Sequence, residues 1–267
     1  MPGGRAAKVL DALNDFLNRA ESHDNDVNYD ASAAGPIACF SYVHQLGIQA
    51  IAVNLVHTAP LANSRQWPLC WQSSRFKSIF RFWNTCKLRT LTSATDEMNA
   101  LNPPGRRQCF ATTTVRNDLP TLEAAHAAYM DSTASLRSLK VKGLVFTLVM
   151  QPLLPAWSRK GDPNPLGLDD SPADEPLVIV SFTVNWDEAQ NDAIVKDLIK
   201  RTVTNIEKVA KDRGTGHRYR YLNYCAEWQS PFQGYGAENL ECMRHVSKKY
   251  DPDGLFQKGC PGGFKLF

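Results

Sequence analysis

The chain has 267 residues, of which 43% are hydrophobic and 21% charged, a composition sufficient for one large folded domain or two small ones. Its net charge of +3 is too small to indicate a nucleic-acid-binding protein by itself. Because no run of 18 apolar residues occurs, we expect no membrane-spanning helix and no membrane partner.

The first half of the chain predicts a helix followed by a β-hairpin. Residues 5–20 place apolar side chains on one helical stripe. The runs 37–44 and 48–57 are rich in β-forming residues and are joined at Gln45-Leu46-Gly47, which predicts the hairpin. The later elements of this half are an unassigned stretch at 60–83, a short helix at 96–101, a strand at 108–115 and a helix at 121–139.

The second half predicts two strands, at 143–151 and 177–186, separated by a proline-rich loop. No helix separates these strands, so we expect them to pair in antiparallel fashion. The remaining elements are a long helix at 187–213, a strand at 219–224 and a helix at 237–250. The element order predicts an α+β fold, in which helices cover mainly one face of an antiparallel sheet.

Cysteine and histidine spacing does not indicate a metal site. The seven cysteines are scattered with no C-x-x-C pair, and the six histidines show no close ligand spacing, so the expected metal set is none. Reduced thiols and the lack of an apolar signal region after Met1 favour a cytoplasmic location.

The stretch 65–89 combines six basic residues with six aromatic ones and contains no acid. Such interleaving can bind single-stranded nucleic acid, but no motif of a nucleic-acid-binding fold accompanies it. We therefore expect no nucleic-acid partner, and instead a poorly ordered loop or an exposed aromatic patch.

The most informative motif is Tyr221-Leu222-Asn223-Tyr224. On a strand, alternate side chains point to the same face, so Tyr221 and Asn223 would form a phenol–carboxamide pair opposite Tyr224. Taken alone, such a strand is most often packing material. Downstream follow Tyr235-Gly236-Ala237-Glu238-Asn239, Lys249-Tyr250-Asp251-Pro252 and the terminal segment 253–267.

Together these segments closely resemble the C-terminus of the berberine-bridge-enzyme-like FAD-linked oxidases of the vanillyl-alcohol-oxidase superfamily, fungal members especially. The resemblance extends to the loop segment Asn164-Pro165-Leu166-Gly167-Leu168, which could border a substrate entrance or serve as a rigid connector. It covers nearly the whole chain, but only the later half of the family's length.

The resemblance implies site residues. Tyr221 or Tyr224 would be the catalytic base or a hydrogen-bond donor to substrate, and Asn223 would face FAD. Asn239 is placed in the same cofactor-side segment, with a structural role. Arg218 and Arg220 are the cations in position to lower the pKa of a phenol, Tyr224 in particular.

Two family carboxylates have no counterpart here. The chain has Cys225-Ala226 and Gln229-Ser230-Pro231 where aspartates are common in the relatives, which leaves the full catalytic geometry open. The glycine after Tyr235 precedes a helix whose N-terminus could meet an anion or could simply be capped.

The sequence also lacks a G-x-G-x-x-G segment, which is one form of phosphate cradle. We therefore expect residues 1–216 to be a substrate domain and 217–267 a C-terminal segment that packs on an FAD domain absent from this chain. The implied function is the substrate-side half of an oxygen-dependent FAD-linked oxidoreductase acting on a small organic metabolite, inactive alone. The alternative is a non-catalytic module that associates with a separate flavin domain, with an intact relative or with itself.

Overall fold

The computed structural model describes residues 4–21, 30, 32–59, 68–72, 74–100, 102, 104–158, 161–168 and 175–267. Within these residues lies one six-stranded antiparallel sheet with strand order β2-β1-β4-β5-β3-β6. The strands are β1 (Ile37–Val43), β2 (Ile48–Asn54), β3 (Arg107–Arg116), β4 (Val145–Leu153), β5 (Leu177–Trp186) and β6 (Gly216–His217).

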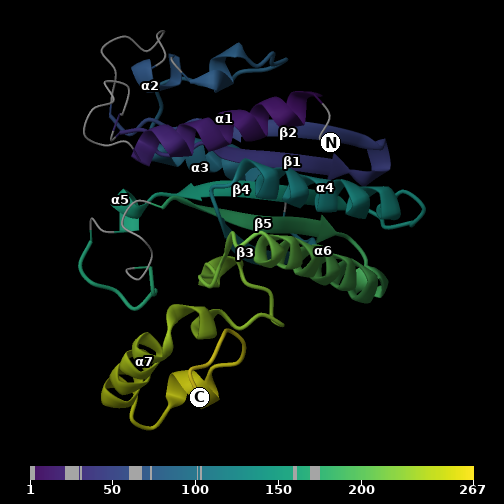
Figure 1. Ribbon diagram of the computed structural model, residues 1–267. Coiled ribbons are helices and arrows are strands. Elements are labelled where there is room, and N and C mark those ends of the chain that lie inside the picture. The colour runs from purple at the N-terminus through teal and green to yellow at the C-terminus, as the bar shows by residue number, and fades with distance from the viewer. Residues whose placement is uncertain are drawn as a thin grey trace.

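Three long helices cover one face of the sheet (Figure 1). They are α1 (Gly4–Glu21), α4 (Leu119–Leu136) and α6 (Asp192–Asp212). The side chains of Phe40, Leu148 and Phe182 stand opposite one another in the strand register and are buried in the core that these helices complete. Successive side chains of a strand point to opposite faces, so one face of the sheet packs against the helices, and burial alternates accordingly along β1 and β4.

The other face of the sheet carries smaller and more polar side chains. Ser41, Thr147, Thr183 and Phe110 form one row across β1, β4, β5 and β3, and each is only partly buried. Thr147 donates a hydrogen bond of 3.0 Å to Ser41 within this row. We call this surface the open face, since the three long helices lie on the opposite side.

Most predicted elements are confirmed, and the α+β architecture with them. The hairpin turns at Gly47, which has a φ of 61°, and the strands at 143–151 and 177–186 pair as expected. The short helix is longer than predicted, as α3 (Leu91–Ala100), and the proline-rich loop contains a short helix, α5 (Pro155–Ser158).

The strand predicted at 219–224 is wrong. Pairing with β3 ends after His217, and Leu222–Tyr224 form a single 3-10 turn, η4. The Tyr224 N–H bonds to the carbonyl oxygen of Tyr221 at 2.9 Å, so the backbone closes on itself instead of extending the sheet. The alternation expected of a strand does not apply to these side chains.

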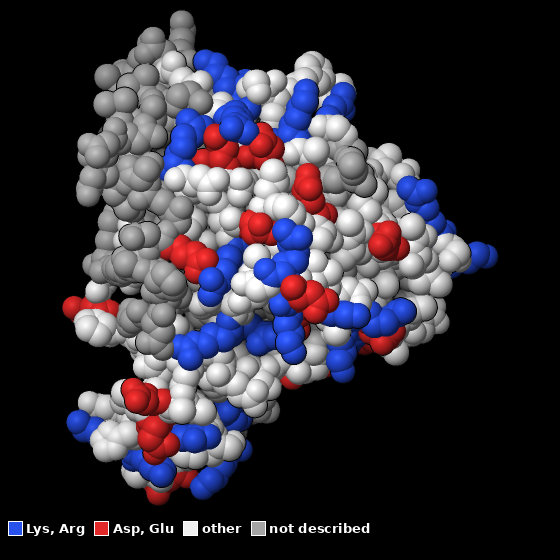
Figure 2. Space-filling view, in the orientation of Figure 1, with Lys and Arg blue, Asp and Glu red and all other residues white. Residues whose placement is uncertain are grey.

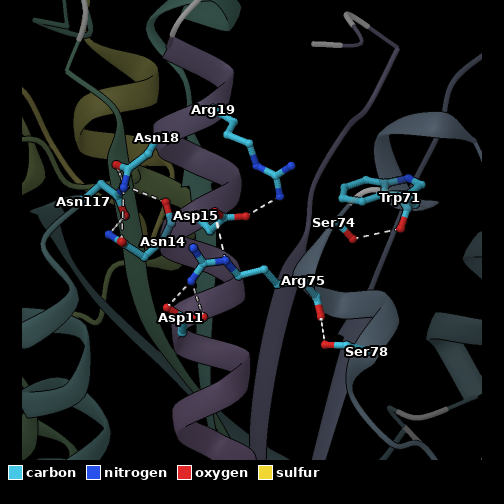
Figure 3. A network of polar contacts seen from close by, with 10 residues as sticks. All are labelled: Asp11, Asn14, Asp15, Asn18, Arg19, Trp71, Ser74, Arg75, Ser78 and Asn117. Carbon is cyan, nitrogen blue, oxygen red and sulfur yellow. Dashed lines mark hydrogen bonds and ion pairs between the residues drawn. The ribbon is translucent and has the colours of Figure 1, made fainter. Parts of the chain in front are cut away.

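The described part of the basic and aromatic stretch is partly anchored to α1, unlike the poorly ordered loop that was one of the two expectations; Arg65 and Trp67 lie outside the described residues. Trp71 of α2 (Leu69–Gln72) stacks on Phe16 with ring centroids 5.2 Å apart. Figure 2 shows basic and acidic side chains interspersed over one face of the molecule. Figure 3 shows the Arg75 guanidinium between Asp11 and Asp15 of α1. Beyond residue 79 the expected exposed aromatic patch is present, formed by Phe80, Phe82 and Trp83.

The C-terminal segment forms a separate small lobe below the sheet in Figure 1. It contains α7 (Ala237–Tyr250) and a π-helical turn, Leu255–Gly259, and α7 has no buried residue. Asp251 accepts hydrogen bonds from the backbone N–H groups of Leu255 and Phe256, which stabilises the turn after α7. None of the described helices is long and apolar enough to cross a bilayer.

Candidate active site

The two motif tyrosines and Asn223 lie together, although no strand positions them. The rings of Tyr221 and Tyr224 meet edge to face with centroids 4.7 Å apart. Asn223 donates its side-chain N–H to the Tyr221 phenol oxygen at 2.8 Å. The predicted phenol–carboxamide pair is therefore present, and a 3-10 turn brings Tyr224 beside it rather than on the opposite face.

Phe110 of β3 seats this pair on the open face. The Tyr224 ring stacks on Phe110 with centroids 5.5 Å apart and an interplanar angle of 20°. Phe110 belongs to the row that also contains Thr183, Thr147 and Ser41. No sequence signal distinguishes Phe110, since an aromatic residue in an alternating strand is ordinary.

The surroundings of Tyr224 favour its neutral form. Burial raises the pKa of this phenol, and the neighbouring Tyr221 and Cys39 raise it further. Arg220 forms an ion pair with Glu207 of α6 at 2.5 Å, and no cation contributes to the Tyr224 shift. The expectation that Arg218 and Arg220 lower the pKa of Tyr224 is therefore wrong, and Tyr224 suits hydrogen-bond donation better than proton abstraction.

His217, at the end of β6, is also neutral at physiological pH. Burial is the largest cause that lowers its pKa to about 4, and the charges of Arg116 and Arg218 act in the same direction. Its Nδ1 accepts a hydrogen bond of 3.1 Å from the backbone N–H of Tyr219. His217 thus fixes the backbone at Tyr219, just before the segment 221–224 that contains the motif tyrosines.

Gln229 fixes the far end of the tyrosine segment to β3. Its side-chain oxygen accepts from the backbone N–H groups of Thr112 and Ala226, both at 3.0 Å, and its N–H₂ donates to the Thr112 carbonyl oxygen at 2.6 Å. The amide occupies the edge of β3 that the two-residue β6 leaves unpaired. The sequence motif Gln229-Ser230-Pro231 carries no signal for this contact.

An apolar cluster, separate from the main core, packs against the two motif tyrosines. Tyr219 and Tyr235 stack with centroids 5.8 Å apart, and both are buried against Ile179 of β5. Leu166 and Leu168 of the proline-rich loop pack on the same cluster. Tyr221 and Tyr224 also pack on this cluster, so both alternatives for the loop, the border of a substrate entrance and a rigid connector, stay open.

Asn239 lies in the first turn of α7, and its amide donates to the Tyr235 carbonyl oxygen at 2.9 Å. This bond ties α7 to the preceding segment. The residue before the helix, Gly236, has a φ of 93°, and a Cβ there would lie 3.6 Å from the Arg218 guanidinium. A contact of Asn239 with a cofactor stays a prediction.

Comparison with known proteins identifies relatives along most of the chain. A Fusarium proliferatum protein named FAD-dependent monooxygenase is 35% identical over 189 residues, which are 68% of this chain and 36% of that protein. Another FAD-dependent monooxygenase, from Emericella nidulans, is 27% identical over 271 residues, 99% of this chain and 54% of that protein. The chain thus spans about half or less of the length of these two relatives. No family model matches.

The fold recurs in a solved structure. BBE-like 1 from Physcomitrella patens superimposes with a TM-score of 0.55 at 14% identity, over 97% of this chain and 52% of that protein. At this identity the likeness concerns the fold alone. It confirms the predicted architecture of an antiparallel sheet with helices.

Proposed function

We propose, from its kinship with fungal FAD-dependent monooxygenases and its berberine-bridge-enzyme-like fold, that this chain forms the substrate side of an oxygen-dependent FAD-linked oxidoreductase. Its substrate is a small organic metabolite of fungal specialised metabolism. One observation carries this proposal: the Tyr221–Asn223–Tyr224 group stacks through Phe110 on a sheet face that the long helices leave uncovered.

The described residues fit part of an FAD site. Aromatic rings and a carboxamide are suited to the flavin ring and to a planar substrate, and the hydroxyls of Ser41, Thr147 and Thr183 are suited to a polar substrate edge. Among the residues that the structure describes, no strand leads through a glycine-rich loop into a helix, so they offer no pyrophosphate cradle of that kind. We infer that the 267-residue polypeptide alone holds FAD weakly and is inactive.

Bound FAD would supply the two-electron oxidation, and the chain would orient the substrate and accept its proton. Tyr221 is the better candidate for the base. Asn223 donates to the phenol oxygen that would carry the negative charge after proton transfer. Tyr224, whose pKa is raised by burial, would remain protonated and donate a hydrogen bond to the substrate.

A flavin titration tests both the proposed position of the flavin site and the proposed weak binding of FAD. Riboflavin carries the ring system without the pyrophosphate, so we expect the purified chain to bind riboflavin and FAD with equal and weak affinity, measured by fluorescence quenching. Tyr224→Ala should abolish this binding, whereas Tyr250→Phe, at an exposed residue of α7, should leave it unchanged. Submicromolar retention of FAD would refute the proposed weak binding. Binding by Tyr224→Ala equal to that of the wild type would refute the proposed position of the flavin site.

The alternative is a non-catalytic module that binds a separate flavin domain or itself. The C-terminal lobe favours it, because Val246, Tyr250 and Phe256 are 48%, 74% and 64% exposed. Sedimentation of the chain with and without the flavin domain of an intact relative separates the two functions. Restored substrate oxidation in the mixture supports the enzyme, and a stable complex without activity supports the binding module.

A further inference from the structure

Three side chains from separate segments of the chain converge beside α1, away from the tyrosine site. They are Asp30, His57 (which follows β2) and Cys70 of α2. Each offers one potential ligand atom, and these three atoms lie within 4.8 Å of one another. No pair of them is close in sequence, which is why spacing predicted no metal site. From this convergence we propose that Asp30, His57 and Cys70 bind a zinc ion.

Hydrogen bonding around His57 leaves a place for a cation. The His57 Nδ1 lies 2.8 Å from the Ala59 carbonyl oxygen, which can only accept, so Nδ1 carries the ring proton. Without a second ring proton, the lone pair of Nε2 faces the Asp30 carboxylate, 2.8 Å away. Two acceptors at this distance require either a second ring proton or a cation between them.

Cys70 supplies a third donor at this place. Its buried thiol lies beside the same carboxylate and hydrogen-bonds with it when no ion is bound. A thiolate, a carboxylate and a neutral imidazole together offer two negative charges and the S, O and N donors that Zn²⁺ prefers. Calcium and magnesium select oxygen ligands instead.

The three segments are already fixed in position. Ala33 and His57 form a β-bridge, and the Ser32 N–H bonds to the Asp30 carboxylate at 2.9 Å. Cys70 is held by its neighbour Trp71, which stacks on Phe16. A histidine whose second nitrogen bonds a backbone carbonyl is the usual supporting arrangement at zinc sites.

Movements of about 1 Å or less admit the ion. Tetrahedral ligands at zinc bond lengths lie about 3.3 to 3.6 Å apart, so the Asp30–His57 contact must widen by about 0.5 Å, and the Cys70 thiol must approach from a separation of at most 4.8 Å. Asp30 and Cys70 also line a cavity of about 30 Å³, which can hold one water as the fourth ligand. Arg19 lines the same cavity, and its positive charge is offset by an ion pair with Asp15.

Metal uptake by the reduced, chelator-treated protein tests the proposal. In competition with a chromophoric chelator, the wild type should bind one equivalent of Zn²⁺ and no Mg²⁺. Cys70→Ser and His57→Ala should lose that equivalent, while the matched variants Cys86→Ser and His245→Ala, both at exposed residues, should retain it. Equal Zn²⁺ uptake by Cys70→Ser and the wild type would overturn the site.

Cobalt gives a second measurement that does not depend on the variants folding. Co²⁺ bound by a thiolate in a tetrahedral site produces an intense charge-transfer band and visible ligand-field bands. We expect both in the wild type and a higher unfolding temperature with either metal. A wild-type protein without these bands would instead identify His57 and Asp30 as an ordinary ion pair.

Discussion

The side-chain amide of Gln229 pairs with both backbone groups of Thr112, at 3.0 Å and 2.6 Å, as a neighbouring strand would. β6 pairs with β3 only at Thr114 and Val115, so the sheet edge next to the tyrosine turn would otherwise be unpaired. One side chain thus ends the sheet and fixes the tyrosine turn against Phe110.

Gln229→Ala should destabilise the protein by about 2 kcal/mol, because the backbone N–H groups of Thr112 and Ala226 lose their acceptor in a partly buried place. Denaturant unfolding measures the change. Gln233→Ala, at an exposed residue of the same segment, should change stability by less than about 0.5 kcal/mol. Equal effects of the two substitutions would show that the hydrogen bonds of the Gln229 side chain contribute nothing to stability.

Gly167→Ala should detach the proline-rich loop from the apolar cluster of Ile179, Tyr219 and Tyr235. Gly167 has a φ of 67°, and a Cβ there would lie 2.3 Å from the Tyr235 carbonyl oxygen. The control is Gly214→Ala, since Gly214 has a φ of 69° and no atom within 4 Å of the added carbon.

Gly214→Ala should cost only the conformational penalty, about 1 kcal/mol, and Gly167→Ala distinctly more. Limited proteolysis should show faster cleavage in residues 161–168 for Gly167→Ala alone. Matching stabilities and cleavage rates for the two variants would contradict the close contact with Tyr235.

Regular periodicity made most of the fold predictable. The alternation in β1 and β4 and the helical stripes of α1 and α6 are local signals that burial on one face imposes. The strand predicted at 219–224 failed because its pairing depends on a distant element. β3 is already satisfied at that point by Gln229, and nothing near Tyr221 in the sequence records this.

The candidate site was predictable in its members and not in its geometry. Tyr221, Asn223 and Tyr224 follow from the motif, but Phe110 and the raised pKa of Tyr224 depend on long-range packing. The predicted effect of Arg218 and Arg220 on the pKa of Tyr224 is wrong, because proximity of charges along the chain does not identify ion-pair partners. Glu207, on α6, pairs with Arg220.

The aromatic stretch that follows α2 should stabilise the protein through burial rather than charge. Phe76 is 4% exposed and packs in the main core, so Phe76→Ala should cost about 3 kcal/mol. Phe82, which is 85% exposed, is the matched control, and Phe82→Ala should be nearly neutral.

Arg75→Met should have little effect, and that effect should shrink with added salt, because the Arg75 and Asp11 side chains are 54% and 43% exposed. A large loss for Arg75→Met, or none for Phe76→Ala, would reverse this ranking. Unfolding curves at low and high salt measure both.

Acid should destabilise the protein through His217. Its pKa is about 4 in the folded chain, mainly because of burial, and lies near 6.5 in an unfolded chain. Between these values the unfolded state binds the additional proton. The contribution of neutral, partly buried His217 to folding stability is therefore fully present above about pH 6.5. It is lost as the pH falls from 6.5 toward 4.

His217→Asn should flatten this slope, because asparagine does not titrate and its carbonyl oxygen can accept from the Tyr219 N–H in place of Nδ1. We expect about 2 kcal/mol less loss of stability between pH 7 and pH 4, allowing for partial solvent exposure. His245→Asn, on the exposed side of α7, should leave the slope unchanged. If His217→Asn follows the wild-type curve throughout, His217 does not titrate as its partly buried position beside Arg116 and Arg218 requires.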